Sequence, residues 1–351
     1  MTTAALALVA GCGRIGFAPL ADAPAGDGTD AGDPLSGVIT IAGSGVAGNA
    51  DGPGPQALFA NPVNLDFGPG GVLYVMDYRN DAMRAIAPDF TVSTAVPMIK
   101  YAPFGIVGSD NMLYAGTDTD PATTSSAVWR VDLQTSSLVM LANGFGQARG
   151  LGLLADGTLV VSDVVDHVLR HLDPTTGTVT LLAGMVGTAG WQDAVGPIAA
   201  FDVPYDMVVL PDQSIVIADA NNHRLRGVRL DGTVTTVAGD GADRTKDGVG
   251  LAASFEQPKS MALDAAGNIY IGDDNAAVIR RLSPDGRVVT VAGTVDTHGF
   301  QDALDPLQAQ FFHLEGITVH GRYLYVADGD VDNTTIPSDR IRRVDLQSLP
   351  P

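Results

Sequence analysis

The stretch from Phe255 to Gly293, FEQPKSMALDAAGNIYIGDDNAAVIRRLSPDGRVVTVAG, holds four short β-prone runs separated by turn residues. The runs are SMALD, NIYIGD, VIRRL and RVVTVAG, and the breaks between them carry Gly, Asn, Asp or Pro. Gly and Asn accept the positive φ of tight turns, and Pro fixes φ at the first central turn position. The stretch therefore predicts four antiparallel strands joined by tight turns. One such sheet cannot bury both of its faces and needs neighbouring sheets.

The same unit recurs along the chain. Its second run closes with an Asp in five places, which are Asp77, Asp163, Asp219, Asp273 and Asp328. The later gaps are 56, 54 and 55 residues, and the first gap of 86 contains a weaker copy, MLYAGTD, at 112–118. Six copies of a four-stranded unit at this period are typical of a β-propeller.

The two ends of the repeat region are incomplete in complementary ways. VITIAG at 38–43 matches later fourth strands such as TVTTVAG at 233–239, but no first three strands precede it. Residues 314–345 supply a first, second and third strand without a fourth. We predict that strand 38–43 joins the C-terminal blade and closes an all-β, six-bladed propeller over residues 37–349, which removes the open edges of the array.

Three sequence segments resemble NHL repeats. They are ADANNHRLR at 218–226, TVAGDG at 236–241, and the connection SGVAGNADGPGPQALFANP at 44–62. The resemblance covers about 38–346, and it is weaker in the second and third copies, which lack the long connection. The family implies a six-bladed propeller that is used mostly for binding, with a minority of enzymes.

The composition narrows the classes of partner. Asp and Glu number 40 against 20 Lys and Arg, so the formal net charge is −20 and the pI is about 4.3. An acidic surface repels nucleic-acid phosphates and anionic lipid head groups, so we expect neither as a partner. One cysteine cannot form an internal disulfide. We expect a monomer that binds a protein, a peptide or a small molecule.

Residues 1–12 resemble the signal peptide of a bacterial lipoprotein. The segment ends in LVAGC at 8–12, and Cys12, the only cysteine, stands where that family is lipidated. Residues 13–36, rich in Gly, Pro, Ala and Asp, are predicted to be a flexible tether. We expect lipidation at Cys12 and an extracytoplasmic place in the bacterial cell envelope. Gly13 rather than Asp follows the cysteine, which favours the outer membrane; an ordinary disordered N-terminus is the alternative.

The long connections carry a repeated pattern that we interpret as scaffold. Each contains a Phe shortly before a first strand, at Phe59, Phe201, Phe255 and Phe311, and an Asp ahead of it, at Asp51, Asp193, Asp247 and Asp302. A reaction needs its residues once, whereas this set occurs four times. We expect the Phe to fill the gap between neighbouring sheets and the Asp to cap the short turn that follows.

The residue that opens each first strand differs in every copy. In chain order these residues are Val63, Phe104, Arg149, Tyr205, Lys259 and Glu315. First strands enter beside the central channel. We therefore predict that the last five of these residues bind a ligand at the mouth of the channel, and that Trp191 lies on a connection that flanks the mouth. Arg149 offers a fork of donors for a carboxylate. The alternative is that these groups pair with one another, Lys259 with Glu315, and simply fill the mouth.

No catalytic or metal-binding motif stands out. NHL-like amidating lyases place zinc-binding His residues at these opening positions, and here none is His. Only His298 and His313 could face the mouth together. Two histidines are too few for a catalytic zinc ion, which is held by three protein ligands. We therefore expect no catalytic residues and no cofactor, and the sequence favours a tethered binding module. The alternative is a lactonase-like or strictosidine-synthase-like hydrolase or lyase, with Asn64, Asp206 and Glu315 holding a divalent ion such as calcium in the channel.

Overall fold

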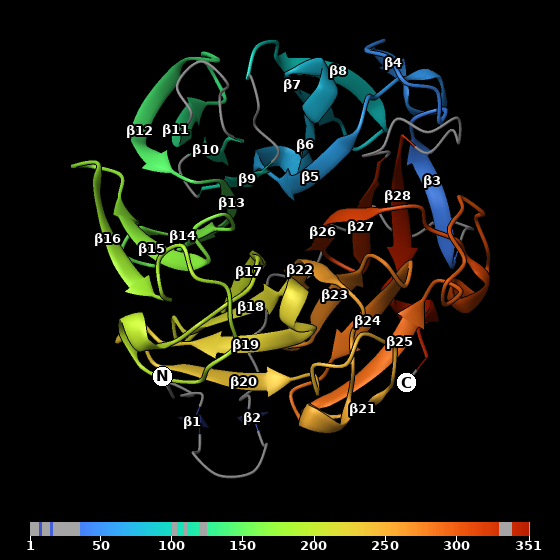
Figure 1. Ribbon diagram of the computed structural model, residues 1–351. Helices are drawn as coiled ribbons and strands as arrows, with labels where there is room; N and C mark the ends of the chain where they lie inside the picture. Colours follow the sequence, from blue (N-terminus) through green and yellow to red (C-terminus); the bar gives the residue numbers. More distant parts are fainter. Residues whose placement is uncertain are drawn as a thin grey trace, which may run out of the picture.

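The computed structural model describes residues 7–8, 15–16, 36–99, 104–108, 111–118, 125–329 and 339–350 of the chain. Six antiparallel sheets stand around a central channel in sequence order, which the run of colours in Figure 1 follows. Their regular structure consists of strands and single 3-10 turns, so the predicted six-bladed β-propeller is confirmed. In the described part of the chain no helix is long and apolar enough to cross a membrane.

The first strand of each blade lies at the channel and the fourth at the rim. Blades 1 to 3 comprise β5 (Pro62–Phe67), β6 (Leu73–Asp77), β7 (Ala82–Ile86) and β8 (Thr91–Val96); β9 (Phe104–Val107), β10 (Met112–Gly116), β11 (Ser126–Asp132) and β12 (Leu138–Phe145); and β13 (Ala148–Leu153), β14 (Leu159–Asp163), β15 (Val168–Asp173) and β16 (Thr178–Ala183). Blades 4 to 6 comprise β17 (Pro204–Val209), β18 (Ile215–Asp219), β19 (Arg224–Val228) and β20 (Val234–Ala238); β22 (Pro258–Leu263), β23 (Ile269–Asp273), β24 (Val278–Leu282) and β25 (Arg287–Ala292); and β26 (Leu314–His320), β27 (Tyr323–Asp328), β28 (Arg340–Asp345) and β3 (Val38–Ala42).

Short elements complete the described chain. Two-residue strands are β1 (Ala7–Leu8), β2 (Ile15–Gly16), β4 (Gly52–Pro53) and β21 (Gly248–Val249). The 3-10 turns are η1 (Gly54–Gln56), η2 (Pro69–Gly71), η3 (Tyr78–Asn80), η4 (Gly196–Ile198), η5 (Ala220–Asn222), η6 (Gly250–Ala252), η7 (Pro306–Gln308) and η8 (Leu346–Ser348). Strand β1 pairs with β2. Cys12 and most of the predicted signal peptide and tether lie outside the described residues, so both remain predictions.

The ring closes between the two ends of the propeller. Strand β3 pairs antiparallel with β28, with Val38 opposite Val344 and Ala42 opposite Ile341. In Figure 1 the blue strand β3 accordingly lies beside the red strand β28. The prediction that the N-terminal strand completes the C-terminal blade is therefore confirmed.

The four connection phenylalanines occupy the gaps between neighbouring sheets, as expected. All four side chains are fully buried. Phe201, for example, packs in one apolar cluster with Leu169 of blade 3 and Met207 of blade 4. A buried aromatic side chain contributes a large apolar area, so each Phe joins two sheets into one core.

The predicted role of the connection aspartates is wrong. Asp193 does not cap the following turn η4, which has no side-chain cap. Its carboxylate instead accepts hydrogen bonds from Thr236 N and Thr236 Oγ1 at 2.9 and 3.0 Å, and pairs with Arg226 at 2.7 Å. Arg226 reaches Asp219 at 2.6 Å with its other amino group and lies over the Phe201 ring. The Asp therefore ties the connection to the sheet of the next blade.

The same arrangement occurs in blades 1, 4, 5 and 6, and we call it the arginine lock. Each lock contains a connection Asp, a third-strand Arg, the Asp that ends the second strand, and a rim Thr. The sets are Asp51, Arg84, Asp77 and Thr94; Asp193, Arg226, Asp219 and Thr236; Asp247, Arg280, Asp273 and Thr290; and Asp302, Arg342, Asp328 and Thr40. A pattern repeated in this way is structural, which confirms its interpretation as scaffold.

Candidate ligand-binding site at the channel mouth

The predicted mouth residues come together in one cluster. Arg149 Nη1 donates to Tyr205 Oη at 2.8 Å, and Tyr205 Oη donates to Glu315 Oε2 at 3.3 Å. Lys259 Nζ donates to Glu315 Oε1 at 3.2 Å. The Phe104 ring meets the Tyr205 ring edge-on, with 5.4 Å between centroids. Five first strands therefore deliver five side chains to one place.

Val63, the sixth opening residue, does not join this cluster. It is buried among apolar side chains such as Met76, Met83 and Leu113, between blades 1 and 2. The mouth is consequently asymmetric, with its charged groups on the side of blades 2 to 6.

A second layer of residues completes the site, and sequence reasoning missed it. Arg149 Nη2 pairs with Asp118 at 3.0 Å, and Lys259 Nζ pairs with Asp274 at 2.7 Å. Tyr78 Oη donates to Asp118 at 2.7 Å. A signal was present, because these residues stand one place after the end of the second strand, or two places in blade 2. At this position the repeat varies from copy to copy as Tyr78, Asp118, Val164, Ala220, Asp274 and Gly329.

Two further side chains come from positions just before the first strands. Gln147 Nε2 donates to Asp118, and His313 Nδ1 lies 3.3 Å from Asp274. His298, the other histidine expected near the mouth, bonds with the backbone carbonyls of Asn275 and Phe312. Thus His313 belongs to the polar network, whereas His298 holds a loop.

In the mouth, neighbouring opposite charges offset the effect of burial on the pKa of each charged group. Burial alone would lower the pKa of Lys259, but the charges of Asp274 and Glu315 raise it well above its usual range. Burial alone would raise the pKa of Asp274, but Lys259 and His313 hold it far below its usual range. Burial acts to lower the pKa of His313, and the bond to Asp274 outweighs it, so that pKa is raised. Each of these charged groups therefore lies beside a group of opposite charge. This is the alternative arrangement, in which the mouth residues pair with one another.

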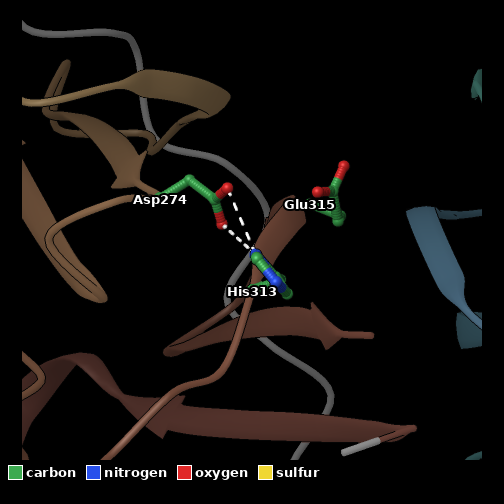
Figure 2. Close-up of side chains that lie close together, drawn as sticks. All are labelled: Asp274, His313 and Glu315. Carbon is green, nitrogen blue, oxygen red and sulfur yellow. Dashed lines mark hydrogen bonds and ion pairs between the residues drawn. The ribbon is translucent and has the colours of Figure 1, made fainter. Parts of the chain in front are cut away.

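Three of these side chains have the chemistry of metal ligands. Figure 2 shows Asp274 directed at His313 with Glu315 beside them. Among the described residues this is the single group of three His, Cys, Asp or Glu ligand atoms that all lie within 4.8 Å of one another. Lys259 Nζ donates to both carboxylates, at 2.7 and 3.2 Å, so an ammonium group already occupies the place of a cation.

The acids of the enzyme alternative make separate contacts. The Asp206 carboxylate accepts the backbone N–H groups of Met207 and Met261, at 2.8 and 2.9 Å, whereas Glu315 accepts hydrogen bonds from Lys259 and Tyr205. It lines a channel cavity of about 370 Å³ together with Asn64. Burial raises the pKa of Asp206 to about 7.

Trp191, expected to flank the mouth, is half-exposed on its connection. Its indole ring stacks against the guanidinium of Arg224, 4.3 Å from the ring centroid. This contact fixes the side chain against blade 4, and no described residue of the mouth network bonds to it.

Comparison with known proteins supports the class that the repeats predict. No family model matches the chain. It is 27% identical over 291 residues to the Arabidopsis thaliana protein SUPPRESSOR OF QUENCHING 1, chloroplastic, covering 70% of this chain and 27% of that protein. It is 24% identical over 220 residues to NHL repeat-containing protein 2 of Bos taurus, covering 53% of this chain and 30% of that protein. The chain thus spans less than a third of either relative.

Solved structures agree on the architecture. A structural genomics protein from Bacteroides thetaiotaomicron matches with a TM-score of 0.71 and 22% identity, over 87% of this chain and 74% of that one. An auxiliary nutrient binding protein from the same organism matches with 0.69 and 21%, over 87% and 75%. Virginiamycin B lyase from Staphylococcus aureus matches with 0.53 and 12%, over 88% and 99%. The repeats, the six blades and the curated relative make this chain a six-bladed β-propeller of the NHL-repeat type.

Proposed function

We infer that the chain is an extracytoplasmic binding module, tethered to the bacterial envelope through Cys12, whose ligand docks at the channel mouth. The observation that carries this proposal is the convergence of Phe104, Arg149, Tyr205 and Lys259 with Glu315 from five blades. These positions vary while the surrounding framework repeats, and function belongs to the part of a fold that departs from its repeat. The similar nutrient binding protein supports a binding role for this propeller shape.

The pairing of the mouth groups sets the chemistry of the ligand. Arg149 directs one amino group at Tyr205 and the other at Asp118, so a ligand carboxylate would have to displace Asp118 from the guanidinium. An uncharged polar ligand can exchange hydrogen bonds with the edge of the network without breaking an ion pair. Phe104 and Tyr205 add rigid apolar surface that loses little entropy on binding. We therefore expect a neutral polar molecule or a peptide backbone rather than an isolated carboxylate.

Affinity measurements on mouth variants test this proposal. A thermal-shift screen of neutral sugars, amino acids and short peptides supplies the ligand, and calorimetry measures its affinity. We expect Arg149→Ala combined with Lys259→Ala to weaken binding at least tenfold, because truncating two central polar contacts costs more than about 2 kcal/mol in all and about 1.4 kcal/mol is a factor of ten. The control is Arg244→Ala with Arg287→Ala, which removes two exposed cations that pair with Asp240 and Asp285 rather than with a residue of the mouth.

A second variant guards against misfolding, because the double substitution leaves Glu315 and Asp274 without cations. Tyr205→Phe keeps the ring contact with Phe104 and removes only the hydroxyl group that joins Arg149 to Glu315. If both sets of variants bind as tightly as the unchanged protein, the mouth is not the site.

A hydrolase or lyase that uses a divalent ion is the second candidate function. The close approach of Asp274, His313 and Glu315 favours it, since three protein ligands suffice for a catalytic site. Against it stands Lys259, whose ammonium group an entering ion would have to displace. Elemental analysis of the purified protein distinguishes the two candidates. One equivalent of metal that is lost in His313→Ala would favour the enzyme, and we expect no stoichiometric metal.

A further inference from the structure

The long connections of this propeller also cover the rims of the blades that they enter. In blades 1 and 5 the covering segment forms a strand, β4 beside β8 and β21 beside β25, both antiparallel. In blades 4 and 6 it forms a single bridge, from Val195 to Thr233 and from Ala303 to Val38. The edge of the fourth strand is thus occupied by an extended piece of the same chain in four blades.

Among the described residues, blades 2 and 3 show no such cover. Across the described residues, β12 pairs only with β11 and β16 pairs only with β15. The connection into β13 consists of Gly146 and Gln147 alone, and it is too short to cross a rim. In the described part of the chain, each rim strand therefore has an outer row of backbone groups that pairs with no further strand, although Gly177 lies against the Leu141 carbonyl and Gly232 against the Leu182 carbonyl.

The lock is incomplete in these two blades, although blade 3 keeps Arg170 paired with Asp163 at 3.2 Å. Across the rim pair, the other four blades place a lock Arg opposite a Thr, as with Arg226 and Thr236. In blade 3 the corresponding pair is Arg170 with Leu181, and in blade 2 it is Trp129 with Met140. The rim Thr that would receive a connection Asp is thus replaced by an apolar side chain in both blades, by Leu181 in blade 3 and by Met140 in blade 2.

Strand β12 is the more prominent of the two edges. With eight residues it is the longest rim strand in the described chain, and its sequence LVMLANGF contains no charged residue. Leu138, Val139 and Met140 are 38%, 45% and 48% exposed. Soluble proteins usually cover, shorten or charge such an edge, because it is a template for pairing with another strand.

We propose that β12 is a docking edge for an extended, uncharged segment of another protein, which adds to blade 2 as a further antiparallel strand. The fold itself shows the occupant, because the equivalent edges of four blades hold short extended segments in antiparallel register. The absence of charge on β12 in a chain of net charge −20 matches an uncharged and apolar segment. The same net charge opposes the approach of a second copy.

A labelled peptide tests the proposal on the intact chain. The probe is a capped, fluorescein-labelled octapeptide of alternating Thr and Val, and its partner carries N-methyl groups on alternate amides, which keep the side chains but remove the donors. We expect saturable binding of the first peptide, at least tenfold weaker binding of the second, and new protection from hydrogen exchange in 138–145. Met140→Lys should weaken binding at least tenfold.

The matched control is Val249→Lys, since Val249 is 48% exposed on β21, in a blade whose rim is already covered. Equal binding of the two peptides, equal binding by the two Lys variants, or no saturable binding would overturn the proposal. A dimer in sedimentation that Met140→Lys dissociates would identify a second copy as the occupant and would also overturn it. The peptide comparison uses the unchanged protein, so it holds even if a variant fails to fold.

Discussion

The arginine lock of blade 4 offers the sharpest test of what holds the blades together. Arg226 is fully buried and donates to Asp219, to Asp193 and to the carbonyl groups of Ala200 and Gln192. Replacing it by Met keeps most of the apolar stem over the Phe201 ring and removes all of these donors. Asp219, which is also fully buried, would then lose its charge partner.

The structure predicts a graded set of losses. Removing one partner of a buried ion pair costs about 3–5 kcal/mol, because the other charge stays desolvated. We expect a loss in this range for Arg226→Met. Asp193 is 43% exposed, and a pair at the surface contributes about 0–1 kcal/mol, so Asp193→Asn should cost about 1 kcal/mol. Arg170→Met in blade 3 should cost less than Arg226→Met. Arg170 pairs with Asp163 and Asp166 of its own blade rather than with a connection Asp, and its side chain is 18% exposed.

Urea denaturation followed by circular dichroism measures these differences as midpoints. A chain of this size need not unfold in two states, so midpoints are compared among variants rather than extrapolated. If Arg226→Met moves the midpoint no further than Asp193→Asn, the buried lock does not stabilise the propeller and the reasoning is refuted.

Three further predictions follow from the closure, the channel and the N-terminus. Deleting residues 1–44 should lower the melting temperature far more than deleting 1–34, because only the longer deletion removes β3 from β28; equal shifts would contradict ring closure. Burial raises the pKa of Asp206 from 3.8 to about 7, so the folded state holds a proton that the unfolded state releases. Its contribution is therefore complete below about pH 4 and is lost as the pH rises through 7, with a slope of at most about 1.4 kcal/mol per pH unit. Asp206→Asn should flatten the dependence of the urea midpoint on pH over this window, and an unchanged slope would argue against the raised pKa. Cys12→Ser should release the protein from membrane fractions of a bacterial host, and undiminished membrane association would dismiss lipidation at this residue.

The repeating part of the structure could be predicted because the same pattern of strands and turns recurs several times in the sequence. The alternation of apolar runs and turns located the strands of the stretch 255–293, and the unmatched strand 38–43 located the closure. Phe59 and its three counterparts were also interpreted correctly, since a large apolar residue at a fixed place in a repeat has few roles other than packing.

Contacts between blades were harder to predict. The partners of Asp193 are Arg226 and Thr236, which stand 33 and 43 residues further along the chain, so the local sequence suggested a turn cap instead. At the mouth, candidate residues were taken from the openings of the first strands, and the residues that follow the second strands were not considered. Asp118 and Asp274 were missed for this reason, although they pair with the predicted cations Arg149 and Lys259.

A crystal structure of the protein with the ligand from the thermal-shift screen tests the central proposal most directly. We predict that the ligand lies at the channel mouth, within hydrogen-bond distance of Arg149, Tyr205 or Lys259 and against the ring of Phe104. A ligand found instead in the channel cavity beside Asp206, or on the outer face of a blade, would contradict the proposal.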